Sequence, residues 1–215
     1  MPIRILIADD HGIVREGLRM YLQWDPELEV VGEAADGKEA VAQAQGLRPD
    51  IVLMDILMPR MDGLAATTAI RRTCPETEVL ALTSVLDDTI IRQAIGAGAI
   101  GYLLKDTGSD ELCRAIHAAA GGQVQLSRAV AQRLTAGQEH YAPLQSLTER
   151  ELDVLRQVAH GRSNKEIALE LGIAEKTVKA HVGSLLNKLG VVSRTQAALL
   201  AVQCGLVRLD ENAEV

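Results

Sequence analysis

The sequence predicts two domains of different class, an α/β domain followed by an all-α domain of four helices. Two observations predict this. In the first 121 residues, short apolar runs alternate with longer amphipathic stretches, as in a doubly wound parallel sheet covered by helices on both faces. From residue 147 onward, four amphipathic stretches follow one another with no apolar run between them, which is typical of a small helical domain.

Five short apolar runs in the first part have the length and composition of buried strands. They are Ile3–Ala8, Glu29–Ala34, Ile51–Met54, Glu78–Thr83 and Ile100–Leu104. A stretch with helical periodicity follows each run. These stretches are Gly12–Gln23, Gly37–Gln45, Gly63–Arg72, Asp87–Ala97 and Ser109–Gly121. Five such pairs make a compact domain over residues 1–121 with a five-stranded parallel sheet.

Periodicity fades after this domain, and glycine and proline interrupt residues 122–146, so we expect a linker there. Residues 147–210 then form the second domain, and residues 211–215 a short polar tail. The predicted helices of the second domain are Glu149–His160, Asn164–Leu171, Glu175–Leu189 and Arg194–Cys204. Three of them begin with a capping box. The pairs are Thr148 with Glu151, Ser163 with Glu166, and Ser193 with Gln196.

Composition excludes several classes of protein. Of 215 residues, 47% are hydrophobic and 24% charged, which excludes a wholly disordered chain. Aromatic residues are 2%, with no Phe, so platforms for stacking single-stranded bases are not expected. The net charge of −7 is uneven: residues 1–143 carry 13 basic and 20 acidic groups, and residues 144–205 carry 8 and 6. This asymmetry suits an acidic regulatory domain joined to a nucleic-acid-binding one.

Sequence features also point to a cytoplasmic protein without membrane contact. The three cysteines, Cys74, Cys113 and Cys204, are scattered, which fits a reducing compartment better than a disulfide framework. The N-terminus has no signal-peptide pattern, since Ile3–Ala8 reads as a strand and leads into two aspartates. No apolar stretch approaches the roughly 18 residues of a membrane span.

Polar residues stand at the carboxyl ends of four predicted strands. Asp9 and Asp10 follow the first strand, Asp55 the third, Thr83 ends the fourth and Lys105 follows the fifth. Parallel strands bring their carboxyl ends to one edge, where ligands bind. A single aspartate there is most often a turn or helix cap, but the joint arrangement favours a site.

Three clustered carboxylates would repel one another, and a bound Mg²⁺ would relieve that repulsion. A carboxylate at such a site can also act as a nucleophile and form an aspartyl-phosphate. Lys105 could then pair with one phosphoryl oxygen, and the Thr83 hydroxyl could donate a hydrogen bond to another.

The motifs of this part resemble the receiver domain of two-component response regulators over residues 1–121. They are ILIADDH at 5–11, LMDILMPRMDG at 53–63, LTS at 82–84 and GYLLK at 101–105. The resemblance implies a flavodoxin-like sheet, with Asp55 as the phosphoacceptor. It also implies that Asp10, Asp55 and the backbone carbonyl of Leu57 ligate Mg²⁺, with Asp9 acting directly or through water.

The resemblance further implies that Lys105 and Thr83 bind the phosphoryl group. Tyr102 would be the aromatic switch residue that turns inward when Thr83 moves, although an ordinary half-buried strand aromatic would look the same. Many receivers have proline after this lysine, whereas Asp106 stands here, so a cis bond is not expected. Leu57 and Val85 lie two residues after Asp55 and Thr83. Neither can orient a water by hydrogen bonding, which predicts a long-lived phosphoryl group.

In the second part, Asn164–Leu171, a short turn and Glu175–Leu189 form a helix-turn-helix, whose second helix enters the major groove of DNA. The motifs LTERE at 147–151, GRSNKEIA at 161–168, KTVKAHV at 176–182 and SRTQA at 193–197 resemble the LuxR-type effector domain. The two halves together resemble a NarL/FixJ-family transcriptional regulator, and in detail the LiaR/VraR subgroup.

Carried over by position, the resemblance implies that Lys179 and Ala180 face base edges. Lys176, Thr177, His181 and Lys188 would position the phosphate backbone, and His181 could equally be a packing residue. Two residues depart from the pattern. Ala174 stands where the family has a Ser or Thr cap, and Gly183 stands where a longer side chain reaches the groove. Arg194–Cys204 would be core and, by resemblance, also part of a dimer contact.

The predicted function is a DNA-binding transcriptional response regulator. A sensor histidine kinase would phosphorylate Asp55 with Mg²⁺ as cofactor, and a homodimer would then bind a two-fold site on double-stranded promoter DNA, with RNA polymerase as a further partner. We do not expect an enzyme beyond self-catalysed dephosphorylation. One alternative is a phosphorylation-independent transcription factor that uses the receiver only for dimerisation. Another is a phosphatase or phosphotransferase, which would need an acidic group where Leu57 stands.

Overall fold

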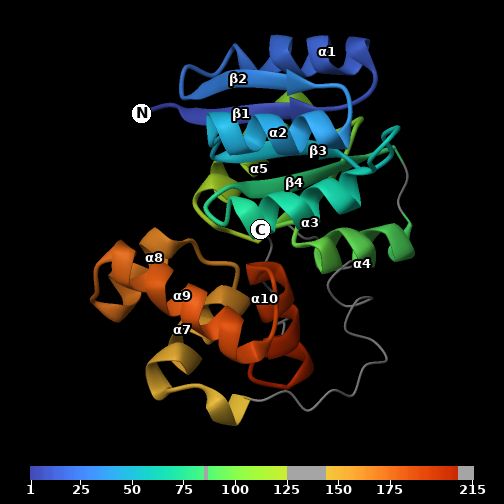
Figure 1. Cartoon of the computed structure of the whole chain (residues 1–215). Coiled ribbons are helices and arrows are strands. Elements are labelled where there is room, and N and C mark those ends of the chain that lie inside the picture. The colour runs from blue at the N-terminus through green and yellow to red at the C-terminus, as the bar shows by residue number, and fades with distance from the viewer. Residues whose placement is uncertain (85–86, 125–143, 208–215) are drawn as a thin grey trace. The chain divides into compact units, whose positions relative to one another are not determined.

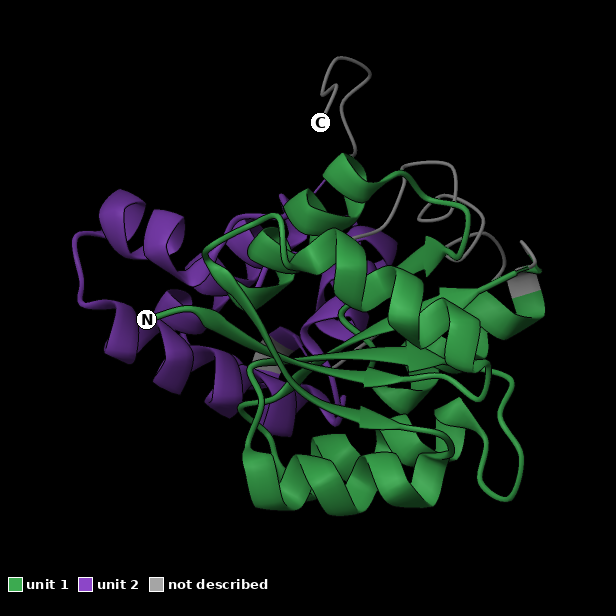
Figure 2. Ribbon diagram, turned by 90° about the horizontal axis from the view of Figure 1, so that it is seen from above, with its two compact units in different colours: residues 1–120 green, residues 121–215 purple. Residues whose placement is uncertain are grey.

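The computed structural model describes residues 1–84, 87–124 and 144–207. The chain divides into two compact units, Met1–Ala120 and Gly121–Val215 (Figure 2). Among the described residues, no helix is both long and apolar enough to cross a membrane. The predicted fold classes of both parts are confirmed, and each unit is described by itself below.

The first unit is built on one parallel sheet with strand order β2-β1-β3-β4-β5 (Figure 1). The strands are β1 Ile3–Ala8, β2 Leu28–Ala34, β3 Ile51–Asp55, β4 Glu78–Thr83 and β5 Gly101–Leu104. All four pairings between neighbouring strands are parallel. The order reverses between β1 and β3, so the carboxyl ends of these two strands flank the crevice in which such sheets bind ligands.

Four helices connect the strands and a fifth follows β5, and together they cover the sheet on both sides, so that the strands form the middle layer in Figure 2. The helices are α1 Gly12–Leu22, α2 Gly37–Leu47, α3 Gly63–Thr73, α4 Asp88–Ala97 and α5 Ser109–Ala120. Asp36, Asp62 and Asp87 cap α2, α3 and α4 by accepting backbone N–H bonds. Each cap satisfies donors that the first helical turn leaves free.

Alternate residues of the central strands belong to two different cores. Ile5 and Ile7 of β1 pack with residues of α1 and α5, whereas Leu6 and Ala8 pack with residues of α2 and α3. All four side chains are fully buried. Because successive strand residues point to opposite faces, this pattern requires apolar residues at every position, which is why the strands appear in the sequence as unbroken apolar runs.

The second unit is a helical domain with a single core. Its helices are the 3₁₀ turn η1 Leu144–Ser146, then α7 Glu149–Ala159, α8 Asn164–Leu171, α9 Glu175–Leu189 and α10 Arg194–Gln203 (Figure 1). Val154, Val178 and Leu185 are fully buried where α7, α8 and α9 meet. Gly172 ends α8 in the left-handed conformation, with φ +63°, and makes the turn into α9 that defines a helix-turn-helix.

Two of the three predicted capping boxes are complete, at Thr148 with Glu151 and at Ser163 with Glu166. In the third, Ser193 accepts from the Gln196 amide, but the Gln196 side chain accepts from the amide of Val192, one residue before the cap. At α9 the N-cap is Ala174, without a side-chain cap bond, as the sequence predicts.

Most of the predicted linker (122–146) and the whole predicted tail (211–215) lie outside the described residues. The first residues after α5 are described, and they belong to the second unit, within which they pack. The amide of Asn164 donates to the carbonyl of Gly121, and the Gln123 side chain donates to Glu166 at 3.0 Å. Val124 packs against the core of the helical domain.

Candidate functional site

The predicted polar residues of the first unit meet at the carboxyl edge of the sheet. Asp9 and Asp10 follow β1, and β3 is one residue longer than predicted, so Asp55 ends it. Thr83 is the last residue of β4, and Lys105 follows β5 directly. Asp9, Asp55 and Thr83 are no more than 2% exposed. Buried ionisable groups at a ligand-binding edge are typical of a functional site.

Lys105 joins two of these carboxylates. Its Nζ lies 2.7 Å from Oδ2 of Asp55, with which it makes a hydrogen bond, and 2.7 Å from Oδ2 of Asp9. The contact with Asp9 is an ion pair without hydrogen-bond geometry, because that buried oxygen has no hydrogen-bond partner. One cation therefore serves two buried anions and leaves a net negative charge.

The pKa values of Asp55 and Lys105 both reflect this excess of negative charge. Burial raises the pKa of Asp55; the hydrogen bond from Lys105 lowers it, the charge of Asp9 raises it, and the net effect is upward. Burial lowers the pKa of Lys105, but its hydrogen bond with Asp55 and its ion pair with Asp9 outweigh that effect and raise it. The site thus stabilises the ammonium ion and disfavours a second buried carboxylate charge beside it.

A divalent cation fits the residues present. Ligand atoms of Asp9, Asp10, His11 and Asp55 all lie within 4.8 Å of one another. Oδ2 of Asp9 is a buried carboxylate oxygen without a hydrogen bond, and its contact with Lys105 is an ion pair. Mg²⁺ prefers hard oxygen ligands of this type. His11 was not among the predicted site residues, yet its Nδ1 lies 2.8 Å from Oδ1 of Asp10. Its place directly after the Asp pair was the only available signal in the sequence.

The loop after β3 is held close to Asp55. The amide of Leu57 donates to Oδ1 of Asp55 at 3.2 Å, and the Leu57 side chain is 64% exposed. The amide of Gly63 donates to the carbonyl of Ile56, and a Cβ at Gly63 would lie 1.9 Å from the carbonyl oxygen of Asp55. Only glycine lets α3 begin so close to the end of β3.

Thr83 and Tyr102 are hydrogen-bonded through their side chains, on the neighbouring strands β4 and β5. Burial raises the pKa of the half-buried Tyr102, and the bond with Thr83 only partly offsets this. Val85, on which the predicted long lifetime of the phosphoryl group partly rests, lies outside the described residues. Lys105 and Asp106 are joined by a trans bond, as expected.

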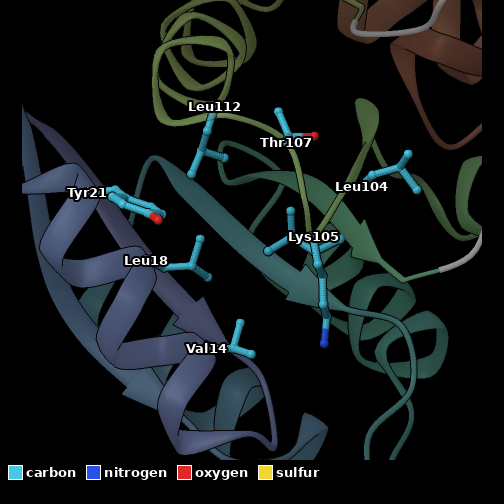
Figure 3. Close-up of a pocket in the computed structure, with 8 residues that line it drawn as sticks. Val14, Leu18, Tyr21, Leu104, Lys105, Thr107 and Leu112 are labelled. Carbon is cyan, nitrogen blue, oxygen red and sulfur yellow. The ribbon is translucent and has the colours of Figure 1, made fainter.

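A small pocket adjoins the site between α1 and α5 (Figure 3). Val14, Leu18 and Tyr21 project from α1 toward the segment that carries Lys105. The remaining lining residues are Leu82, Leu104, Thr107 and Leu112. This lining is largely apolar, so the pocket offers no further charged ligand for an anion or a metal ion.

The second unit presents the outer face of α9 to solvent. Lys176, Thr177, Lys179, Ala180, Gly183 and Lys188 are exposed there, and His181 is half-buried. Lys179 and Glu175, one turn apart, form a loose surface pair at 3.9 Å. Gly183 has open space around the position of a Cβ. An exposed helix face bearing three lysines after a tight turn suits entry into the major groove.

Lys188 differs from the other lysines of α9. Its Nζ lies 2.7 Å from Oε2 of Glu151 on α7. The Ser184 hydroxyl donates to the other oxygen of the same carboxylate, also at 2.7 Å. The sequence prediction included Lys188 in the DNA-binding set but assigned Glu151 only to a helix cap. No local pattern could have shown this partnership, because the partners are 33 and 37 residues apart.

Comparison with known proteins covers both units. The response regulator receiver domain family matches residues 5–117, and the luxR family of bacterial regulatory proteins matches residues 145–201. The transcriptional regulatory protein LiaR of Bacillus subtilis strain 168 is 46% identical over 209 residues, which cover 95% of this chain and 99% of LiaR. The response regulator VraR of Staphylococcus aureus strain Mu3 is 42% identical, over 97% of this chain and all of VraR. A solved structure of two RcsB dimers bound to two parallel DNAs has 27% identity and a TM-score of 0.57, and covers 95% of this chain and 99% of RcsB.

Proposed function

This chain belongs to the two-component response regulators that join a receiver domain to a luxR-family DNA-binding domain, and from that premise we propose that phosphorylation of Asp55 controls DNA binding by α9. The observation that carries the proposal is the buried cluster of Asp9, Asp55 and Lys105 at the carboxyl edge of the sheet. This cluster provides a nucleophile together with a cation already in contact with it.

In the proposed reaction, a carboxylate oxygen of Asp55 attacks the phosphorus of a phosphohistidine on a sensor histidine kinase. A new O–P bond forms, the N–P bond breaks, and the imidazole nitrogen leaves with the bonding electrons. Lys105, already 2.7 Å from Asp55, would pair with a phosphoryl oxygen, and the Thr83 hydroxyl would donate to another. Both groups stabilise charge that the transfer brings to Asp55.

Mg²⁺ is the proposed cofactor, held by Asp10, Asp55 and the backbone carbonyl of Leu57, with Asp9 acting directly or through water. When bound there, Mg²⁺ would supply positive charge to the carboxylates and to the phosphoryl oxygens. The ligand atoms of Asp9, Asp10, His11 and Asp55 lie within 4.8 Å of one another, which supports this assignment, since Lys105 alone does not balance the charge of these carboxylates.

We propose that Thr83 and Tyr102 carry the signal away from Asp55. When Thr83 moves toward the phosphoryl group, its hydrogen bond with Tyr102 moves with it. Tyr102 lies on β5, which together with α4 and α5 would form the face that receives the signal. A change there would favour a homodimer competent for DNA, provided that phosphorylation stabilises one of two states.

The proposed DNA surface is the exposed face of α9. Lys179 and Ala180 would face base edges, Gly183 would lie in the groove without a side-chain contact, and Lys176, Thr177 and His181 would position the phosphate backbone. Lys188 is the seventh residue that the sequence predicts for this surface, but it is paired with Glu151 at the end of α9 and is therefore set apart from the other six. The RcsB dimers on DNA support a dimeric complex on double-stranded promoter DNA. We also propose RNA polymerase as a partner.

The proposed division of labour assigns residues 1–121 to the receiver domain, 122–146 to a linker, 147–210 to the DNA-binding domain and 211–215 to a tail. In this scheme the protein acts as a switch, and its only chemistry is to accept the phosphoryl group on Asp55 and release it again. The exposed Leu57 side chain offers no group that could act as a second general acid, which disfavours a turnover enzyme.

The test is to incubate the protein with Mg²⁺ and acetyl phosphate, and to measure intact mass, size-exclusion elution and DNA binding beside Asp55→Asn. A phosphoryl adduct confined to the wild type, together with a shift toward dimer and tighter DNA binding, is expected. Absence of an adduct with both acetyl phosphate and a cognate kinase, while DNA binding is unchanged, would instead favour the phosphorylation-independent transcription factor.

A further inference from the structure

Glu151 is a buried carboxylate that links two helices of the DNA-binding domain. It lies in the first turn of α7 and is 4% exposed. Its Oε2 accepts from the Thr148 amide at 2.8 Å and from the Thr148 hydroxyl at 3.0 Å. These two bonds belong to the cap of α7.

The same carboxylate also receives two donors from α9. Ser184 donates to Oε1 and Lys188 to Oε2, each at 2.7 Å. Residues four apart lie above one another on a helix face, so both donors point to the same side of α9. Glu151 therefore holds α9 at two points one turn apart. The four donors together keep the pKa of Glu151 at about 2.

We propose that Glu151 is a positioning residue for DNA binding: it fixes α9 through Ser184 and Lys188, and it keeps the Lys188 ammonium from neutralising a DNA phosphate. The proposal rests on the DNA-binding function of α9 and adds that its exposed lysines have different roles. Lys176 and Lys179 remain available to DNA, whereas Lys188 is a structural cation.

The free energy of the Glu151–Lys188 pair favours a structural role for Lys188. If Lys188 turned to a phosphate, Glu151 would remain ionised, nearly buried and without its cation. The Glu151 carboxylate is buried, although the Lys188 side chain is 36% exposed, and a buried charge that loses its partner is costly because it is not compensated. A phosphate contact favours DNA binding by releasing counterions, but at Lys188 it would also have to compensate for the carboxylate left without its cation. The pair with Glu151 should therefore persist when DNA binds.

The first experiment measures the reactivity of single lysines in the full chain without DNA. Mass spectrometry after brief treatment with acetic anhydride gives a relative acetylation rate for Lys188, Lys176 and Lys179. We expect Lys188 to be the slowest and to become several-fold faster in Glu151→Gln. Glu149→Gln is the matched control, because Glu149 is exposed on the same helix and loses the same charge. Equal rates for Lys188 in wild type and Glu151→Gln would overturn the proposal.

The second experiment measures how DNA affinity depends on salt, with a fluorescent mixed-sequence duplex as the probe. Each phosphate neutralised by a lysine adds about 0.9 to the steepness of log affinity against log salt. Glu151→Gln should steepen the dependence by up to this amount, because Lys188 is released. Adding Lys188→Met should restore the wild-type slope, and Lys188→Met alone should leave it unchanged.

Two outcomes separate this inference from the function on which it rests. A slope that becomes shallower by about 0.9 in Lys188→Met alone would show that Lys188 contacts a phosphate in the wild type, and would overturn the inference. If Lys176→Met and Lys179→Met also leave the slope unchanged, α9 is not the DNA surface and the proposed function itself fails. The acetylation rates decide the Glu151–Lys188 pairing even in that case.

Discussion

The ammonium of Lys105 makes a 2.7 Å hydrogen bond to Asp55, so the proposed phosphoacceptor has a cation in contact before any phosphoryl group arrives. Burial and the charge of Asp9 both raise the pKa of Asp55, and Lys105 opposes them. Two consequences follow: removal of Lys105 should change the titration of Asp55, and removal of an acidic neighbour should change the affinity for a cation.

Lys105→Met should move the acid limb of the phosphorylation profile to higher pH. Without the ammonium, the pKa of Asp55 rises further, and a protonated carboxyl group cannot attack phosphorus. Adduct yield from acetyl phosphate and Mg²⁺ is measured by intact mass over a range of pH. Lys38→Met, at an exposed position of α2, is the control. Superimposable profiles for Lys105→Met and wild type would refute this role of Lys105.

Mg²⁺ should raise the melting temperature of the protein. Binding to the folded state alone stabilises it by about 1.4 kcal/mol when free Mg²⁺ is about ten times its Kd. Asp10→Asn should lose most of this gain. Asp25→Asn is a matched control, because Asp25, Glu27 and His117 form a second cluster of potential ligands elsewhere in the unit. An equal loss in both variants would show that Mg²⁺ acts through general screening of charge.

Gly63→Ala should unfold or strongly destabilise the receiver domain. The Cβ of the new alanine would lie 1.9 Å from the carbonyl oxygen of Asp55. The atoms it meets are backbone atoms of Asp55 and Ile56, which cannot move aside as a flexible side chain could. We expect a loss of about 3 kcal/mol or more. Gly46→Ala, on an exposed position of α2 with open space around it, should instead gain up to about 1 kcal/mol. Urea unfolding of both variants measures the contrast, and a mild effect at Gly63 would contradict it.

Prediction from sequence succeeds where a residue's role follows from its own strand or helix. Asp55 is foreseeable because an apolar run ends at it, and β3 then places it at the sheet edge. The missing side-chain cap at Ala174 can be predicted equally well, since capping depends on residues that are neighbours along the chain. For Glu151, such reasoning predicts only part of the role. Its capping role is local, whereas its bonds to Ser184 and Lys188 arise only when α7 packs on α9.

Ala174→Ser should stabilise the DNA-binding domain by about 1 kcal/mol. Ala174 already has the extended backbone of an N-cap, with φ −71° and ψ 144°, but lacks a side-chain acceptor for the free amides of α9. Ser163→Ala, which removes the working cap of α8, should cost a similar amount. Thermal unfolding followed by circular dichroism tests the pair. Destabilisation by Ala174→Ser would mean that these amides are satisfied in another way.

Glu151 should also make stability depend on pH in the acid range. Its pKa is about 2 in the folded protein and 4.5 as an ordinary glutamate. Because the folded value is the lower one, the stabilisation is complete above about pH 4.5 and is lost as the pH falls toward about 2. It amounts to at most about 3 kcal/mol. Urea unfolding of wild type and Glu151→Gln should therefore differ most near neutral pH and converge in acid. A difference that is the same at about pH 7 and about pH 3 would show that Glu151 stabilises the domain through shape and hydrogen bonds, independently of its charge.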